Sequence, residues 1–550
     1  MDKRWILAAG AAACASWVAA CGDDGGDGLE AQRGDFFNNN GGESPSPGQN
    51  NTTGNNANNA ANNAANNDNS FEPEPEERFN LQRPQPSRNY VFVANTDLDT
   101  VARIDGDTLE IKSIEVGDEP TVVRTWQGNN VAAVLNEGSS DVSILHSQGE
   151  QVEVVTLPMR EGFNQLVIAP GGEYALTYLD YAEYQLGDDL GKFQDVNLIR
   201  LREGEEEVFN LAVGFHVLEI EFDEDGQHAY IITEDGVSAV KMDDVRSDRR
   251  VQPIAVSDDP REDALAVDRE VEITRDGRLA LVRTSALQGV NLVPLEGASE
   301  LLHVPMPGVP TDLDIYPDSG RAVAVLKSSR QVAVLDLAEP DAVADSVRLI
   351  DVEEGPVGLA ALDFEADLAL LYTLSEQVPQ VVRLDLDTGA QVVWDVRKSL
   401  RGVQMSPSGE RAVLFHQQND TPRSQDPADL FLSRQHAYTL LDLRTGFAKL
   451  QTIPTSEGEF VFSPDSEWMF LVLSDEAQDV RQVERVHLES FRVDSYRLGS
   501  LPEHLGLLPS ENLQRVYISQ KHAVGRMTFI DIATGDSRTV TGYELNSQIE

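Results

Sequence analysis

The chain has 550 residues, 41% of them hydrophobic, so it is long enough for a large core or several domains and has the composition of a globular protein. It carries 93 acidic and 43 basic side chains, a formal net charge of −50, and 81 of the acidic residues follow residue 89. This charge repels phosphate backbones and anionic headgroups, which excludes nucleic acid as an expected partner. Two interpretations stay open: solubility in a salt-rich setting, or recruitment of Ca²⁺ or a basic partner.

The first residues form a pattern typical of a secretory signal. Lys3 and Arg4 precede an apolar run from Trp5 to Ala20, which is too short and interrupted for a transmembrane helix of about 20 apolar residues. The run ends in Val18-Ala19-Ala20-Cys21, which resembles the signal of bacterial lipoproteins. In that family an aliphatic residue stands three positions before an invariant cysteine, with small residues between them.

The resemblance implies that residues 1–20 are a lipoprotein signal peptide and that Cys21 becomes the lipid-attachment residue. A multiply acylated cysteine holds a protein stably at a membrane, so we expect a lipid-anchored protein of the cell envelope, on the periplasmic face or the cell surface. Cys14 is a competing site, and an ordinary secretory signal is the alternative. No other cysteine follows Cys21, so the remaining chain has no disulfide and no thiolate nucleophile.

Residues 21–89 are of low complexity. They are rich in Gly and Asp first, then in Asn and Ala, and then in Pro and Glu. Apolar residues are too few to offset the entropy of ordering, so this segment is predicted to be a disordered tether. A flexible chain of this length has a mean span of about 45 Å. Self-association through the Asn-rich tract is a minor alternative.

From residue 90 onward, two kinds of turn recur. One kind is rich in Gly, Pro and Asp, lies between two apolar strands, and repeats about every 48 residues between Gly128 and Asn512. The other often follows an aliphatic residue and an aspartate, as in Leu384-Asp385 and Leu441-Asp442. Each period holds about four short strands with apolar alternation, for example residues 311–316, 321–326, 331–336 and 346–352.

Tandem units of four strands are the signature of a β-propeller. The sequence therefore predicts an all-β fold, a β-propeller of four-stranded blades over residues 90–550, with a stacked or sandwich assembly as the alternative. The run Tyr90-Val91-Phe92-Val93-Ala94-Asn95 and the pairs Ile104-Asp105 and Ile530-Asp531 are similar to the YVTN-type repeats of lactonase-like seven-bladed propellers. The resemblance implies the fold and, by analogy alone, a hydrolase with a site in the central channel.

The number of blades depends on how the ring closes. Nine units are complete, whereas the first has no obvious first strand. We expect the C-terminal segment Tyr543–Ile549 to supply that strand, which gives ten blades. Seven to ten blades, or two smaller propellers, remain compatible with the sequence.

Because strands alternate in direction, the turns joining first to second and third to fourth strands share one face, and all other loops share the opposite, loop-rich face. The two long insertions, Tyr181–Asp195 and Gln417–Arg434, both fall between second and third strands and so belong to the loop-rich face. If Tyr90 opens a second strand, the tether enters at the face of the tight turns. We then expect the loop-rich face to point away from the membrane.

Motifs of known chemistry are missing from the sequence. It has no nucleophile elbow, no zinc-protease motif and no phosphate-binding Gly loop, and its nine His residues have no metal-ligand spacing. The acidic runs Asp97-Leu98-Asp99 and Asp105-Gly106-Asp107 do not continue into an EF-hand loop and are interpreted as turns. We therefore expect no cofactor, no catalytic residue and no metal site.

The candidate binding residues are Tyr181, Tyr184, Asp188 and Asp189, which make one insertion aromatic and acidic. The alternative is a solvated loop. A binding or scaffold module for a protein or envelope partner is the leading expectation, since surface loops on a rigid scaffold carry such function. The alternative is a lactonase-like hydrolase, which carboxylates or a His converging in the central channel would favour.

Overall fold

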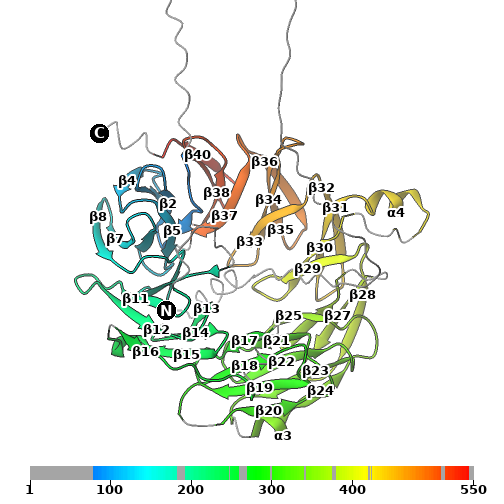
Figure 1. The fold of residues 1–550 in the computed structure, drawn as a ribbon. Helices are drawn as coiled ribbons and strands as arrows, with labels where there is room; N and C mark the ends of the chain where they lie inside the picture. Colours follow the sequence, from blue (N-terminus) through cyan, green and yellow to red (C-terminus); the bar gives the residue numbers. More distant parts are fainter. Residues whose placement is uncertain are drawn as a thin grey trace, which may run out of the picture. The chain divides into compact units, whose positions relative to one another are not determined.

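The computed structural model describes residues 79–543 except 182–191, 247, 259–268, 298–299, 340–341, 375–378, 419–421, 423 and 509–513. The fold is all-β, with 53% of the described residues in strands and 4% in helices. Ten antiparallel blades follow one another around a ring, in the order of the chain (Figure 1). The prediction of a β-propeller with about ten repeat units is confirmed.

The strands of each blade are consecutive in the chain and are numbered from the centre outward. Blades 1 to 5 contain β1 (Gln85–Pro86), β2 (Tyr90–Asn95), β3 (Thr100–Asp105) and β4 (Ile111–Glu115); β5 (Pro120–Thr125), β6 (Val131–Asn136), β7 (Asp141–Gln148) and β8 (Gln151–Pro158); β9 (Gln165–Ile168), β10 (Tyr174–Tyr178), β11 (Asp195–Arg200) and β12 (Glu207–Ala212); β13 (Val217–Phe222), β14 (His228–Thr233) and β15 (Gly236–Lys241); and β17 (Glu270–Ile273), β18 (Leu279–Arg283), β19 (Gly289–Pro294) and β20 (Leu302–Pro305).

Blades 6 to 10 are all four-stranded. They contain β21 (Asp312–Ile315), β22 (Arg321–Leu326), β23 (Gln331–Asp336) and β24 (Arg348–Asp351); β25 (Leu359–Asp363), β26 (Leu368–Tyr372), β27 (Gln380–Asp385) and β28 (Gln391–Asp395); β29 (Leu400–Met405), β30 (Arg411–His416), β31 (His436–Asp442) and β32 (Ala448–Ile453); β33 (Glu457–Phe462), β34 (Trp468–Asp475), β35 (Val480–His487) and β36 (Arg492–Arg497); and β37 (Pro502–Leu508), β38 (Arg515–Gln520), β39 (Arg526–Asp531) and β40 (Ser537–Thr541).

Blade 4 is the irregular one. The chain leaves β15 through the short helix η3 (Met242–Asp244), and β16 (Arg249–Arg250) then pairs in parallel with β12 of blade 3 instead of completing blade 4. Among the described residues, an isolated bridge between Val237 and Ile254 is what occupies the fourth position of this blade. Two further short helices, α3 (Val343–Ser346) and α4 (Pro427–Leu432), lie in loops.

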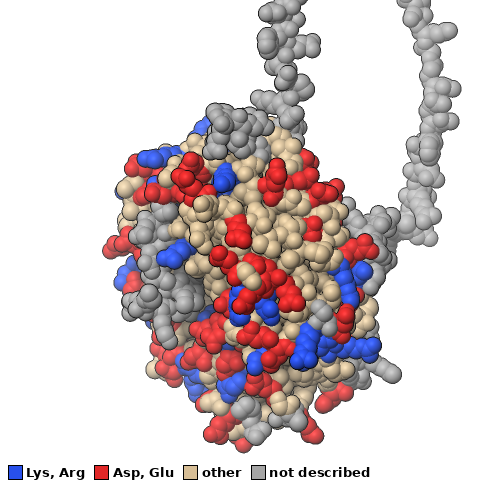
Figure 2. All heavy atoms as spheres, turned by 90° about the vertical axis from the view of Figure 1, so that its left-hand side faces the viewer, with Lys and Arg blue, Asp and Glu red and all other residues tan. Residues whose placement is uncertain are grey.

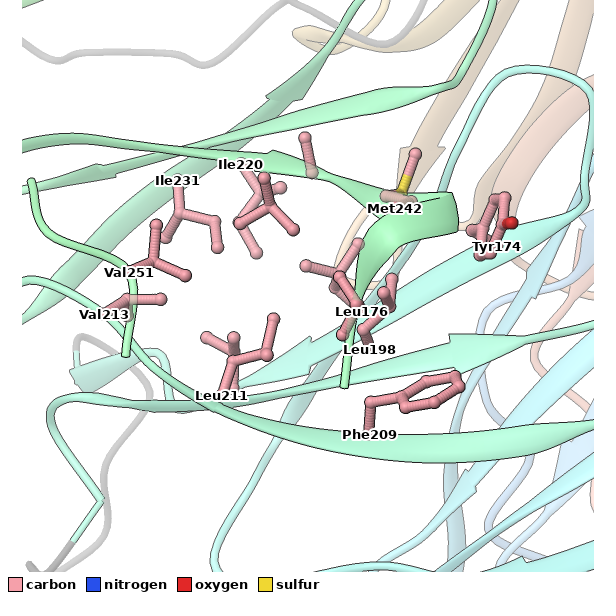
Figure 3. Packing of buried hydrophobic residues seen from close by; sticks show 14 of the residues in the cluster. Tyr174, Leu176, Leu198, Phe209, Leu211, Val213, Ile220, Ile231, Met242 and Val251 are labelled. Carbon is pink, nitrogen blue, oxygen red and sulfur yellow. The ribbon is translucent and has the colours of Figure 1, made fainter. Parts of the chain in front are cut away.

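The core is divided into ten apolar clusters, one at each junction between neighbouring blades. Successive side chains of a strand point to opposite faces, so Tyr90 and Phe92 pack towards blade 2 while Val91 and Val93 pack towards blade 10. Strands buried on both faces are apolar throughout, which explains the runs in the sequence. Figure 3 shows one junction, where Leu176 and Leu198 of blade 3 face Ile231 and Met242 of blade 4.

The recurring aspartate of the outer hairpin has a structural role. The Asp385 carboxylate accepts hydrogen bonds from the backbone N–H groups of Asp387 (3.1 Å) and Thr388 (2.8 Å). Asp105 and Asp442 do the same in their turns. Since a short polar side chain that bonds its own backbone stabilises a turn, the aliphatic-Asp signature marks the third-to-fourth turn of a blade.

Arginine side chains join each of several blades to the outer hairpin of the next. The guanidinium of Arg103 donates to the Gly149 carbonyl (2.9 Å), and that of Arg485 donates to the Ile532 carbonyl (2.8 Å). Arg515 of blade 10 donates to the Gly106 carbonyl of blade 1, so the same contact recurs across the two ends of the ring. The seam at the ends of the chain is therefore built like the other junctions.

The expected source of the first strand is wrong. Gln85 and Pro86 pair with Phe92 and Val91 as β1, so the strand comes from the segment just before residue 90 and not from Tyr543–Ile549. Residues 79–89 thus belong to the ring, although the sequence placed them in the tether. Two Pro residues and a length of two made this strand invisible to an alternation pattern.

The expected face on which the chain enters the ring is also wrong. Because β1 precedes β2, the chain reaches blade 1 on the loop-rich face, where Phe79 donates its N–H to the Ala523 carbonyl (2.9 Å) between β38 and β39. Tyr543 donates its N–H to the Val524 carbonyl (3.0 Å) of the same loop. Both ends of the described chain therefore lie on the loop-rich face.

Candidate functional site

Most of the predicted site residues lie outside the described residues. This holds for Cys21, Tyr184, Asp188 and Asp189. Tyr181 is described, and its side chain is 43% exposed. It lies between β10 and β11, in the first long insertion, on the loop-rich face.

The second long insertion lies between β30 and β31, also on the loop-rich face as expected, and contains α4. Asp426 caps the start of this helix by accepting a hydrogen bond from the Ala428 N–H (2.8 Å). The buried Lys398 ammonium donates to the Leu432 carbonyl (2.9 Å) and the Ser433 carbonyl (3.3 Å) at its end. The helix carries Phe431, which is 58% exposed.

An aromatic patch, formed by Tyr181, Phe193, Phe215 and His216, lies where blades 3 and 4 meet on the loop-rich face. The rings of Phe193 and Phe215 are stacked with centroids 5.5 Å apart, and Tyr181 lies 5.5 Å from Phe193 and 5.8 Å from His216. Phe215, like Tyr181, is 43% exposed. The structure thus places one predicted binding residue within a larger aromatic surface that the sequence did not show.

The turn between β14 and β15 holds the backbone of the aromatic patch in place. Asp235 accepts a hydrogen bond from the Phe215 N–H (2.7 Å), and the Glu234 N–H donates to the Phe215 carbonyl (3.0 Å). The His216 imidazole meets the Glu234 carboxylate at 2.7 Å, and the His216 N–H donates to the Phe193 carbonyl (2.8 Å). The exposed rings therefore project from an ordered backbone, which lowers the entropic cost of binding through them.

A second feature lies on the innermost strands, which line the channel of the ring. In β13, β17 and β21, residues facing the preceding blade are apolar, whereas the alternate residues are acidic. These channel carboxylates are Glu219, Glu221, Glu270, Glu272, Asp312 and Asp314. They form an acidic segment that spans three successive blades.

Few of the channel carboxylates are neutralised. Glu221 accepts a hydrogen bond from the Ile273 N–H (3.3 Å), and Asp312 accepts one from the Ala360 N–H (2.7 Å), each on the next blade. Glu270 pairs with Arg283. Burial, with the like charge of Glu219 added, raises the pKa of Glu221 to about 8, and burial with neighbouring carboxylates raises that of Glu272 to about 8.

Two groups further round the ring behave similarly. Burial raises the pKa of Asp312 to about 6, and burial together with the charges of Asp312 and Glu272 raises that of Asp314 well above its usual range. Carboxyls that stay protonated near neutral pH can donate a proton as well as accept one, as general acids and bases must. The sequence analysis expected that carboxylates converging in the central channel would favour an enzyme, and these residues are of that kind.

A sequence pattern marks the channel carboxylates and could have predicted them. Glu219-Ile220-Glu221, Glu270-Val271-Glu272 and Asp312-Leu313-Asp314 have the same acid, aliphatic, acid spacing at the first strand of successive repeats. A period of two places both acids of a unit on one face of the strand. Their approach to one another across blades, however, depends on the ring.

The His residues contact acidic or polar side chains at separate places. His146 meets Glu206 at 3.0 Å, His228 meets Asp223 at 2.7 Å, and His504 meets Glu459 at 3.1 Å. Over the residues that the structure describes, no group of three or more His, Cys, Asp or Glu side chains is arranged to hold a metal ion. The Asp97 carboxylate accepts from the Asn80 N–H (2.7 Å) and that of Asp99 from the Glu119 N–H (2.8 Å), so both side chains join their turn to neighbouring segments of the chain.

The surface is strongly acidic. Figure 2 shows one face of the molecule, on which Asp and Glu side chains gather in clusters with scattered Lys and Arg among them. Within the described part of the chain, no helix is both long enough and apolar enough to cross a membrane.

The fold and the ring geometry define this chain as a ten-bladed β-propeller repeat protein. No protein-family model matches the sequence, and no curated protein is significantly similar to it. Among solved structures, the dihydro-heme d1 dehydrogenase NirN in complex with DHE is 12% identical, with a TM-score of 0.40 and coverage of 75% of this chain and 73% of its own. Kuenenia stuttgartiensis hydrazine synthase is 14% identical, with a TM-score of 0.28 and coverage of 70% and 99%. These likenesses are too distant to assign an activity.

Proposed function

We propose that this protein is a lipid-anchored propeller of the cell envelope that binds a protein or envelope partner through its loop-rich face. The observation that carries the proposal is the concentration of exposed aromatic side chains on that face: Tyr181 and Phe215 in the aromatic patch, and Phe431 on α4. Exposed aromatic residues on an ordered scaffold are common anchors of binding sites. Both long insertions contribute to the same face.

The proposed location in the cell envelope rests on the residues that precede the ring. Val18, Ala19 and Ala20 before Cys21 support acylation of that cysteine, and the long polar segment after it supports a tether. The described chain begins at Phe79 on the loop-rich face, which is also the face proposed to hold the partner.

The anchor is tested by metabolic labelling with a fatty acid. We expect label in the wild-type protein and none in Cys21→Ala, whereas label retained by Cys21→Ala would contradict the assignment. Cys14→Ala is the matched control, because it removes the competing cysteine and should leave the label unchanged.

Partner binding is tested by photo-crosslinking on intact cells. A photoreactive amino acid at Phe431 samples the loop-rich face, and the same amino acid at Phe447, which is 63% exposed in the turn between β31 and β32, samples the opposite face. We expect a defined cross-linked species from position 431 and none from position 447. Equal products from both positions, or none from position 431, would contradict a binding role for the loop-rich face.

A second candidate function is hydrolysis in the central channel. It is favoured by Glu221 and Glu272, whose pKa values near 8 suit proton transfer at neutral pH. The test is turnover of a panel of lactones and esters by the wild-type protein and by Glu272→Gln. A hydrolase should lose about 100-fold or more of its activity in this variant, and turnover unaffected by Glu272→Gln would exclude the site.

A further inference from the structure

We propose that the aromatic patch and the channel mouth beside it form a docking surface for a basic, extended segment of a partner protein. The inference rests on the proposed function and names both the place on the loop-rich face and the chemistry of the occupant. The patch leads directly into the channel, because Phe215 and His216 immediately precede β13. Leu218, 47% exposed, and the exposed Glu219 continue the surface along that strand.

The apolar part of this surface contains exposed aromatic rings that contact one another. The Phe193 ring contacts the rings of both Tyr181 and Phe215, and Tyr181 and Phe215 keep over two fifths of their area in solvent. By contrast, Tyr174 and Phe92 of the blades are almost fully buried. Leaving aromatic area in water costs about 25 cal/mol per Å², which a bound partner would recover.

The charges around the patch select the sign of the occupant. Glu234 and Asp235 border the rings of Phe215 and His216, and the exposed Glu219 stands at the channel mouth. The nearby cations are Lys192, which directly precedes Phe193 in the chain, and Arg269, which donates to the backbone carbonyls of Thr233 and Glu234 on the adjacent blade. The local charge is therefore negative beside exposed π faces, an arrangement that attracts guanidinium and ammonium groups.

Charge also favours a basic segment over a second copy of the chain or an anionic lipid surface as the occupant. A second copy would bring another chain with a net charge of −50 to an acidic surface, which repels it. An anionic lipid surface is disfavoured for the same reason. An extended segment that alternates Arg with apolar residues matches both parts, since guanidinium groups stack on aromatic rings and pair with carboxylates while the apolar residues cover Leu218 and the ring edges.

The probe is a fluorescein-labelled peptide of alternating arginine and leucine, titrated by anisotropy into the full-length protein in detergent. We expect Phe215→Ala to weaken binding roughly tenfold. Phe447→Ala, an equally large truncation on the opposite face, should leave affinity unchanged. Glu219→Gln, which removes a carboxylate at the channel mouth, should weaken binding by about threefold at low salt and less at high salt. Circular dichroism and the unfolding temperature check that each variant is folded.

Three results would overturn the inference: no binding to the wild-type protein, equal losses from Phe215→Ala and Phe447→Ala, or equal binding of a peptide that alternates glutamate with leucine. Binding of anionic vesicles or self-association of the protein that Phe215→Ala abolishes would also overturn it, because the occupant would then be a different one. Failure here leaves the broader proposal separately testable. A cross-link from position 431 that Phe215→Ala does not alter would place the partner elsewhere on the loop-rich face, whereas loss of both results would remove both proposals.

Discussion

Carboxylates lie on the inner strands of blade 9 and of blades 4 to 6, but their surroundings differ. In blade 9 the carboxylate has several partners, whereas in blades 4 to 6 most have few. Glu459 of blade 9 accepts hydrogen bonds from the Leu505 N–H (2.8 Å) and His504 (3.1 Å) and pairs with Arg83 (3.0 Å). Burial acts to raise its pKa, but these partners outweigh burial and lower it. At Glu221 and Glu272, burial and like charges act together and raise the pKa.

The comparison distinguishes an inner carboxylate that stabilises the ring from inner carboxylates that have no such structural role. Glu459 ties blade 9 to blade 10 and to the segment before β1, so its charge belongs to ring closure. Within the described residues, Glu272 and Asp314 accept no hydrogen bond and form no ion pair, so neither carboxyl group serves ring closure in this way. Groups of the second kind are where ligand binding or proton transfer is expected. The following four experiments test this distinction, from the largest expected effect to the smallest.

Deletion of residues 79–86 should destabilise the ring most. It removes β1, Arg83 and three backbone hydrogen bonds, from Phe79 to Ala523, Gln82 to Ala94 and Thr96 to Asn80, at about 1 kcal/mol each, or about 3 kcal/mol in total. Calorimetry measures the loss. Deletion of residues 50–69 is the control and should not change the unfolding temperature. An unchanged temperature in both variants would show that β1 does not close the ring.

Glu459→Gln should lower the free energy of unfolding by about 1–3 kcal/mol at pH 7, because it removes the negative charge that contacts both His504 and Arg83. Because the folded pKa of Glu459 is lowered, its contribution is present above the ordinary pKa of about 4.5 and is lost as the pH falls through the folded value. The control is Glu503→Gln on the neighbouring strand, whose side chain is exposed. Chemical denaturation from pH 3 to pH 8 gives the result, and equal behaviour of the two variants would contradict a closing role for Glu459.

The double substitution Glu221→Gln and Glu272→Gln should change the stability in the opposite direction and stabilise the fold at high pH. Both folded pKa values lie near 8, above the ordinary value of 4.5, so wild-type stability falls as the pH rises from about 4.5 towards 8. Neutral amides remove this dependence, and we expect the double variant to unfold about 2 °C above the wild-type protein at pH 9. Thermal unfolding measured across this range decides the matter. A double variant less stable than wild type at pH 9 would mean that these charges are compensated after all.

Addition of millimolar Ca²⁺ should have the smallest effect. Since no group of three acidic or His side chains among the described residues is arranged as a metal site, we expect the unfolding temperature to move by less than about 1 °C. A larger rise that Glu272→Gln abolishes would instead show that the channel carboxylates bind the cation and that the acidity serves recruitment.

Local patterns predicted much of the architecture. The turn signals worked because each has a local cause: the Asp385 carboxylate bonds the backbone of its own turn, and Gly409 adopts a positive φ of 66° after β29. The apolar alternation worked because each blade buries both faces against its neighbours. Tyr181 was found from composition, but Phe193, Phe215 and His216 come from two separate loops and only the fold brings them to it.

The sequence by itself determined the repeat and the all-β class and favoured ten units among seven to ten, because turn chemistry and strand periodicity are properties of a few adjacent residues. The tertiary structure alone decided three matters: that Gln85 and Pro86 supply the first strand, that Phe79, where the described chain begins, lies on the loop-rich face, and that carboxylates from β13, β17 and β21 come together. Each of these depends on contacts between segments far apart in the chain, in which hydrogen bonds, burial and like charges act across blades. Such contacts leave no local pattern to read.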